Sequence, residues 1–374
     1  MIIRKILDDI QKNLFKGKTI IIYGPRQSGK TTLLKMISDL LSQKILLLDC
    51  DEPDVRKDLT DPTSVKLKKM IGPSKVVMID EAQRIKNIGL TIKLIHDKVE
   101  GVQVIATGSS ALELSNKINE PLTGRKFEYL LLPVSTEELI NHTDLITEKR
   151  LLDSRLLYGM YPDVINQEGS ERRILNNLAG SYLYKDIFAF QDVRKPEIIE
   201  NLLEMLSLQI GSEVSYHELA NNLGIDQITV RRYIDLLEKT FVVFRIRAFS
   251  RNLRNEIKKS RKIYFYDNGI RNALISDFGP VGLRVDIGAL WENFLVSERK
   301  KWLNNNFIYS KSFFWRTKQH QEIDYIEESD SIMNAYEFKW SGKKNPKFPL
   351  TFTRSYPHAK TKLITSENYM EFTS

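Results

Sequence analysis

A glycine-rich turn near the N-terminus carries the residues with the clearest chemical role. An apolar run over residues 20–23 leads into Gly24, and Gly29, Lys30 and Thr31 complete the P-loop pattern G-x-x-x-x-G-K-[ST]. The glycines let the backbone approach phosphates, so that the N–H groups of residues 27–32 can form an anion-binding nest at a helix N-terminus. Lys30 would reach the β- and γ-phosphates of ATP, and the Thr31 hydroxyl would bind Mg²⁺. The predicted nucleotide-binding residues are Gly24, Pro25, Arg26, Gln27, Ser28, Gly29, Lys30, Thr31 and Thr32. The alternative is a glycine turn that binds nothing.

Two adjacent acids follow a second apolar run about fifty residues later. Residues 75–79 are typical of a buried strand, and Asp80 and Glu81 come directly after it. A strand in this position supplies the metal-side carboxylate of a P-loop NTPase, so we assign Asp80 to Mg²⁺, directly or through water. Glu81 would be the base or water-orienting group of hydrolysis. The alternative is that both acids are solvated turn residues.

These residues require a parallel sheet to hold them. Apolar runs over residues 44–48, 102–107 and 127–132 add three strand candidates, and helical sequence alternates with the five strands. This pattern predicts a doubly wound α/β fold with a parallel sheet. Ser109 and Ser110 follow the strand at 102–107, where a polar side chain can face the γ-phosphate.

Five short motifs together resemble one protein family. They are Gly-Pro-Arg-Gln-Ser-Gly-Lys-Thr-Thr, Ile-Asp-Glu-Ala-Gln, Thr-Gly-Ser-Ser, Leu-Thr-Gly-Arg and Leu-Leu-Pro-Val-Ser-Thr-Glu-Glu-Leu. The series resembles the AAA-type predicted ATPases of bacteria and archaea that carry a C-terminal domain of unknown function. The resemblance implies an additional-strand ATPase core, with Ser109 or Ser110 in the sensor position. It also implies that Arg125 acts near the γ-phosphate, in cis or across a subunit interface, whereas the alternative for Arg125 is a surface ion pair.

Length and composition limit the class of protein. A chain of 374 residues suggests two or three domains, and 42% hydrophobic with 28% charged residues is typical of a soluble globular protein. No run of 18 apolar residues could span a bilayer, so a membrane protein is not expected. Cys50 is the only cysteine, which excludes an internal disulfide framework and favours a cytoplasmic location. The five histidines are scattered without ligand spacing, and no zinc site is predicted.

The net charge of +8 is concentrated in one segment. Residues 245–262 contain eight basic residues against Glu256 alone, which favours contact with a polyanion such as DNA. The preceding helical patterns at 215–223 and 226–237 are typical of a winged helix-turn-helix, whose second helix would present its N-terminal end to the major groove. The alternative is that this module packs against the ATPase or another protomer. The predicted DNA-binding residues are Gln227, Thr229, Arg231, Arg232, Arg251, Arg254 and Lys258.

The last third of the chain contains a second set of acids. Glu292 lies in a helical pattern, Asp324 in a strand-like run, and Glu337 and Lys339 in the next strand. This order is that of the PD-(D/E)XK nuclease core, in which carboxylates hold Mg²⁺ and the lysine orients water or stabilises a phosphorane. Spacing alone also fits an exposed strand with no such role. The C-terminal domain of the resembling family is similar to a restriction-endonuclease-like fold, and these four residues match its motif.

The expected organisation has four parts. Residues 1–136 form an AAA-type ATPase domain, 137–199 a helical lid or connector, 200–262 a winged helix-turn-helix with a basic wing, and 263–374 a PD-(D/E)XK nuclease-like α/β domain. The preferred function is a Mg²⁺-dependent ATPase that engages DNA, with a possible nuclease activity in its C-terminal domain. The alternative is a nucleotide-dependent switch that binds a protein partner or a second copy of the chain, with the nuclease-like fold serving only as an interaction surface.

Overall fold

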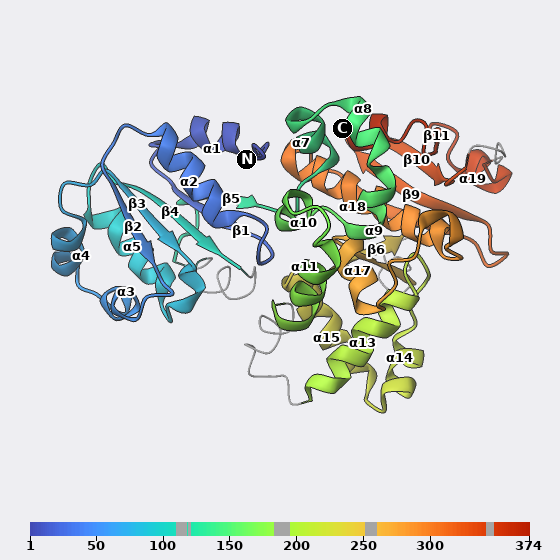
Figure 1. Ribbon diagram of the computed structural model, residues 1–374, viewed down its shortest axis with the longest axis horizontal. Coiled ribbons are helices and arrows are strands. Elements are labelled where there is room, and N and C mark those ends of the chain that lie inside the picture. Colours follow the sequence, from blue (N-terminus) through green and yellow to red (C-terminus); the bar gives the residue numbers. More distant parts are fainter. Residues whose placement is uncertain (110–117, 119–120, 183–194, 251–259, 342–347) are drawn as a thin grey trace. The chain divides into compact units, whose positions relative to one another are not determined.

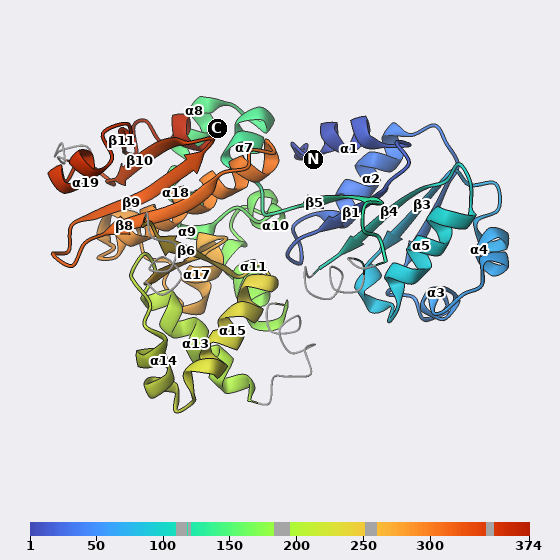
Figure 2. The same cartoon turned by 180° about the vertical axis from the view of Figure 1, so that it is seen from behind.

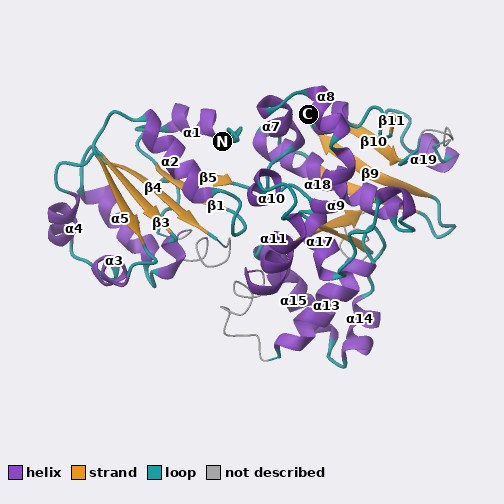
Figure 3. Ribbon diagram, in the orientation of Figure 1, coloured by secondary structure: helices purple, strands orange, loops and turns teal. Residues whose placement is uncertain are grey.

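The described residues form two compact units. The computed structural model describes residues 1–109, 118, 121–182, 195–250, 260–341 and 348–374. The first unit comprises Met1–Pro133 and Lys239–Phe241, and the second comprises Val134–Glu238 and Val242–Ser374. Figures 1 and 2 show the elements from opposite sides, and Figure 3 separates helices from strands.

The first unit is built on a five-stranded parallel sheet, which confirms the sheet predicted for the N-terminal part. Its strands, in chain order, are β1 (Thr19–Tyr23), β2 (Ile45–Asp49), β3 (Val76–Asp80), β4 (Gln103–Gly108) and β5 (Lys126–Leu130). The spatial order is β2-β3-β4-β1-β5, so β4 lies between the strand that leads into the P-loop and the strand that ends in Asp80.

Helices cover both faces of this sheet. On one face, α1 (Leu7–Asn13) and α2 (Lys30–Leu40) share a core with Ile20 and Ile22 of β1. On the other, α3 (Pro53–Leu59), α4 (Ser64–Ile71) and α5 (Ile88–Lys98) pack with Ile21 and with Val77 and Ile79 of β3. Successive strand residues point to opposite faces, which explains why a strand buried on both sides is a continuous apolar run in the sequence.

The second unit contains a six-stranded mixed sheet in the order β11-β10-β9-β8-β6-β7. Its strands are β6 (Val243–Ala248), β7 (Arg261–Phe265), β8 (Lys311–Arg316), β9 (Glu322–Ser329), β10 (Ile332–Phe338) and β11 (Lys360–Ile364). β6 pairs antiparallel with β7 and parallel with β8, so it connects the hairpin to the C-terminal strands.

Helices make up the rest of the second unit. They are α7 (Thr136–His142), α8 (Leu145–Arg150), α9 (Leu152–Tyr158), α10 (Pro162–Asn166), α11 (Glu171–Asn177), α13 (Pro196–Leu208), α14 (Tyr216–Leu223), α15 (Gln227–Lys239), α17 (Asn268–Leu274), α18 (Ile287–Asn305), α19 (Leu350–Ser355) and α20 (Met370–Thr373). Short turns of other helix types are η1 (Ala82–Arg84) in the first unit, and η2 (Leu178–Tyr182) and η3 (Val281–Leu283) in the second. No helix within the described ranges is long and apolar enough to cross a membrane.

The region predicted as a winged helix-turn-helix contains α13, α14 and α15 followed by the hairpin β6–β7. Ser215 caps α14, Gly224 ends it in a left-handed conformation, and Asp226 accepts hydrogen bonds from Thr229 at the start of α15. Glu213 forms an isolated antiparallel bridge to Lys262 of β7. The hairpin is also part of the C-terminal sheet, and the predicted boundary at 262/263 falls inside β7. The winged-helix identity of this module stays a prediction.

We expect Cys50 to report the opening of the first unit. The thiol is fully buried, and burial together with Asp49 and Asp80 raises its pKa to about 12, so both access and thiolate formation require opening. Ile79→Ala removes side-chain volume from the same core and should cost about 2–5 kcal/mol, which accelerates labelling by a thiol reagent by roughly 30-fold or more. Leu47→Ala, at a 62% exposed position on β2, is the matched control and should change the rate by less than about threefold. Equal acceleration in both variants would contradict this account.

Candidate functional site

The P-loop connects β1 to α2 at the carboxyl edge of the parallel sheet. Gly29 caps α2 with φ 94°, a left-handed conformation that favours glycine. Gly24 lies against the residue that follows β5, where an added Cβ would come within 2.0 Å of the Leu131 carbonyl oxygen. The two glycines of the motif are therefore required by backbone conformation at one end of the loop and by close packing at the other.

Lys30 is buried and points into the loop. Its Nζ donates hydrogen bonds to the carbonyl oxygens of Gly24 (3.0 Å) and Pro25 (2.8 Å). The Ser28 hydroxyl also donates to Pro25 O, at 2.8 Å. The ammonium group thus lies at the loop backbone, where the β- and γ-phosphates of a bound nucleotide would be held.

Arg4 stabilises the P-loop through a hydrogen bond to its backbone, a contact that was not predicted from the sequence. The buried guanidinium donates from Nη1 to Ser28 O at 2.7 Å and from Nη2 to Leu132 O at 2.6 Å. It therefore connects the P-loop to the chain that follows β5. A basic residue just before an amphipathic helix gives no signal of such a long-range contact.

Asp80 ends β3 beside the first turn of α2. Its Oδ2 accepts a hydrogen bond from Thr31 Oγ1 at 2.7 Å, and its Oδ1 accepts from the Glu81 backbone N–H at 3.0 Å and from the Thr107 hydroxyl. A hydroxyl and a carboxylate are hard oxygen ligands that suit Mg²⁺, which usually takes one or two carboxylates together with substrate phosphates. Among the described residues, no group of three or more Asp, Glu, His or Cys could hold a metal by itself. A Mg²⁺ ion at Thr31 and Asp80 would therefore need phosphate oxygens to complete its coordination.

Glu81 is held next to this site by a glutamine. The Glu81 backbone is left-handed (φ 50°), which is uncommon for a residue other than glycine and is found at strained functional positions. Its Oε2 accepts from Gln83 Nε2 at 2.5 Å, and the same nitrogen donates to Ser109 Oγ at 3.0 Å. Glu81 and Ser109, predicted from separate motifs, thus meet through Gln83. Gln83 and Thr107 were not predicted as site residues, although Gln83 belongs to the Ile-Asp-Glu-Ala-Gln motif.

Arg125 does not lie at this edge. Its carbonyl accepts from Thr19 N at the start of β1, and its guanidinium pairs with Asp97 near the end of α5 at 3.3 Å. Because β1 and β5 are parallel, Arg125 lies at the amino edge, one five-residue strand away from the P-loop, or roughly 13 Å. The hypothesis that Arg125 acts in cis near the γ-phosphate is wrong for this reason. A role across a subunit interface stays a hypothesis.

The predicted DNA-reading residues on α15 differ in exposure. Gln227, Arg231 and Arg232 are exposed along the N-terminal half of the helix. Thr229 is half-buried, and its hydroxyl donates to Asp226 at 2.6 Å, so it serves the helix cap. Three of these four side chains are therefore open to a partner.

The basic segment is not uniformly available. Arg245 is half-buried and pairs with Asp235 at 2.6 Å and with Glu238. Lys262 is buried among carboxylates, which contradicts its expected place on a phosphate-binding wing. Arg251, Arg254 and Lys258 lie outside the described residues.

The second set of acids lies in one region, and one of its members, Glu292, pairs with a buried lysine. Lys262 Nζ lies 2.9 Å from Glu292 Oε1 and 2.5 Å from Glu322 Oε1. Asp324 accepts a hydrogen bond from the Phe338 backbone N–H at 2.7 Å, and Lys339 Nζ lies 3.4 Å from Glu337 Oε2. The four predicted nuclease residues therefore share one region of α18, β9 and β10. We call Glu292, Glu322, Asp324 and Glu337, with the Lys262 that pairs with two of them, the carboxylate cluster. The places of Lys262 and Glu322 in it were not predicted from the sequence.

Burial dominates the electrostatics of the carboxylate cluster. It raises the pKa of Glu292 to about 7, against the opposing effect of Lys262, and it raises the pKa of Asp324 to about 6 with a further contribution from Glu337. Burial lowers the pKa of Lys262, but Glu292, Glu322 and Asp324 outweigh it and hold that pKa above its ordinary value. Lys262 therefore stays charged at neutral pH.

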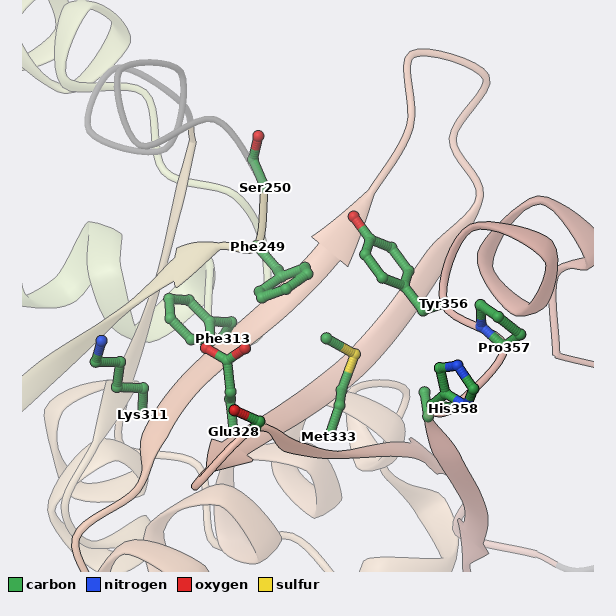
Figure 4. Close-up of a pocket in the computed structure, with 11 residues that line it drawn as sticks. Phe249, Ser250, Lys311, Phe313, Glu328, Met333, Tyr356, Pro357 and His358 are labelled. Carbon is green, nitrogen blue, oxygen red and sulfur yellow. The ribbon is translucent and has the colours of Figure 1, made fainter.

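A separate cavity of about 390 Å³ lies on another part of the second unit. Figure 4 shows the rings of Phe249, Phe313 and Tyr356 together with Lys311 and Glu328. The adjacent Glu327 pairs with Arg299 of α18, so strand alternation places Glu328 and this cavity on the sheet face away from α18. The cavity is thus distinct from the carboxylate cluster, and no sequence motif predicted it.

Comparison with protein families divides the chain into three segments. Residues 16–140 match an AAA domain, residues 149–280 match a domain of unknown function (DUF8612), and residues 287–373 match another domain of unknown function (DUF4143). The AAA match contains the P-loop, Asp80, Glu81 and Ser109.

Similar proteins occur in bacteria and archaea. An uncharacterized protein of Mycobacterium tuberculosis is 27% identical over 336 residues, which cover 88% of this chain and 72% of that protein. An uncharacterized protein of Methanocaldococcus jannaschii is 26% identical over 328 residues, covering 75% of this chain and 67% of that protein. Among solved structures, a Walker-type ATPase of Pyrococcus abyssi has a TM-score of 0.50 at 15% identity, covering 74% of this chain and 96% of that one, which is a likeness of fold. The chain is therefore a P-loop protein that carries an AAA domain followed by two domains of unknown function, and it has uncharacterized homologues in bacteria and archaea.

Proposed function

We propose that the protein is a Mg²⁺-dependent ATPase whose catalytic centre is the P-loop together with Asp80 and Glu81. The observation that carries this proposal is the 2.7 Å hydrogen bond between Thr31 Oγ1 and Asp80 Oδ2. This bond joins Thr31, the residue after the P-loop lysine in α2, to Asp80, the acid that ends β3. The two oxygens that Mg²⁺ requires from the protein are therefore already side by side.

Each residue of the site has a distinct part in hydrolysis. The N–H groups of the loop and the Lys30 ammonium hold the phosphates, while Thr31 and Asp80 hold Mg²⁺, which offsets the negative charge of the phosphates when it is bound. Glu81 orients the attacking water, and Gln83 positions the Glu81 carboxylate relative to Ser109. Ser109 is then close enough to the site to respond to the γ-phosphate.

A second proposal is that the second unit engages DNA through α15. Its support is the exposure of Gln227, Arg231 and Arg232 on the helix half that a helix-turn-helix presents to the major groove. The alternative occupant of this surface is a protein partner. Metal-dependent cleavage of DNA is not part of the proposed function, because Lys262 already pairs with Glu292, one of the predicted metal ligands.

The ATPase proposal predicts that Lys30 and Glu81 fail in different ways. Lys30→Ala should weaken nucleotide binding, because the variant loses the charge that neutralises the phosphates. Glu81→Gln should keep binding and lower turnover on the order of 10²-fold or more, because it removes only the carboxylate that acts on water. Nucleotide affinity by calorimetry and phosphate release would measure both. Glu52→Gln is the matched control, since Glu52 is an exposed acid that follows β2 and should change neither quantity. Normal hydrolysis in both site variants would refute the assignment.

The DNA proposal predicts a uniform loss of affinity when the charge of α15 is reversed. Arg231→Glu with Arg232→Glu should weaken binding to unrelated duplexes by a similar factor, roughly tenfold or more, and reduce the salt slope by about two, because phosphate contacts release counterions. Lys239→Glu, an exposed charge at the other end of the same helix, is the control. Fluorescence anisotropy across a salt series would measure both effects. An unchanged duplex affinity in the double variant would favour the protein partner instead.

A further inference from the structure

The carboxylate cluster of the second unit surrounds one buried ammonium group. Lys262 has a side chain only 3% exposed, and its Nζ contacts Glu292 of α18 and Glu322 of β9. Below the ammonium lies the ring of Phe314, with its centroid 5.5 Å away. Tyr264, on the same strand as Lys262, donates its hydroxyl to the same Glu292 oxygen at 2.6 Å. The ammonium is therefore enclosed by acids from two elements and by an aromatic face.

A metal ion bound by the helix acid Glu292 would compete with this ammonium for the same carboxylate oxygen. The predicted nuclease site needs a cation shared by Asp324 and Glu337, with the helix acid Glu292 as a further ligand. The Asp324 and Glu337 carboxyl groups lie beside each other, since a hydrogen bond between them affects the pKa of Glu337. Glu292 Oε1 is instead occupied by two donors, Lys262 and Tyr264. Asp324 lies near enough to help raise the pKa of Lys262.

We propose that Lys262 is a built-in cation that takes the place of a divalent metal in this cluster, so that the native second unit does not bind Mg²⁺ or Mn²⁺ there. Mg²⁺ ligands lie about 2.0–2.1 Å from the ion. The carboxylate oxygens of Glu292 and Glu322 that would have to reach such an ion are already within hydrogen-bond distance of the Lys262 ammonium. Two cations cannot share this space. The cluster joins α18, β7 and β9 as a structural unit and has no metal-dependent chemistry.

Metal binding by the full-length chain tests this proposal without reference to activity. Mn²⁺ titration without nucleotide, read by electron paramagnetic resonance, would compare the wild type, Asp324→Asn, Lys262→Met and the double variant Lys262→Met with Asp324→Asn. Weak binding at the P-loop is common to all four chains and cancels. We expect the wild type and Asp324→Asn to bind equally. Lys262→Met, which frees the acids, should bind one additional Mn²⁺ that the double variant loses.

Two controls keep each outcome informative. Lys311→Met removes an exposed lysine on β8 of the same sheet and should bind no additional Mn²⁺. Lys262→Arg keeps the positive charge and should also gain no site. A Mn²⁺ site in the wild type that Asp324→Asn removes would overturn the proposal, and so would a folded Lys262→Met that gains none. Should circular dichroism show Lys262→Met unfolded, the comparison of the wild type with Asp324→Asn decides.

Discussion

The architecture of the second unit depends on the ion pairs of Lys262. This lysine lies on β7, at the outer edge of the six-stranded sheet, while its partners Glu292 and Glu322 belong to α18 and β9. Removing one partner of a buried pair typically costs about 3–5 kcal/mol, because the remaining charge is left without compensation. The interaction therefore fixes the hairpin β6–β7 to the helix and strand that follow it by 30 and 60 residues.

The two units hold a strand-terminal acid in opposite ways. Among the described residues, those that donate to Asp80 are neutral, namely the hydroxyls of Thr31 and Thr107 and the backbone N–H of Glu81. Within the described part of the chain no lysine or arginine forms an ion pair with Asp80, which suits the proposed Mg²⁺ site. At Glu292 the protein supplies an ammonium group of its own. The same residue types thus accept only neutral donors at the proposed metal site of one unit and pair with a lysine in the other.

The difference between the surroundings of Asp80 and Glu292 also explains which parts of each site could be predicted from the sequence. The P-loop is contiguous and has a fixed spacing, and parallel strands bring Asp80 and Ser109 to the same edge, so local patterns were sufficient there. Arg125 could have been placed correctly, because a residue that precedes a parallel strand must lie at the amino edge. Lys262 could not, since a charge count does not distinguish a buried base from an exposed one. Its isolated bridge to Glu213 and its distant acidic partners are properties of tertiary structure.

One mechanical consequence follows for the second unit. The core that contains Leu203 of α13, Leu219 of α14 and Ile234 of α15 also contains Val243 of β6 and Ile263 of β7. β6 continues into the C-terminal sheet by pairing with β8, and Lys262 adds its ion pairs across the same junction. A displacement of α15 relative to the C-terminal strands would have to break strand pairing, core packing and buried ion pairs together. The exposed arginines of α15 are therefore connected to the C-terminal sheet by a shared core and by the strand pairing of β6 with β8.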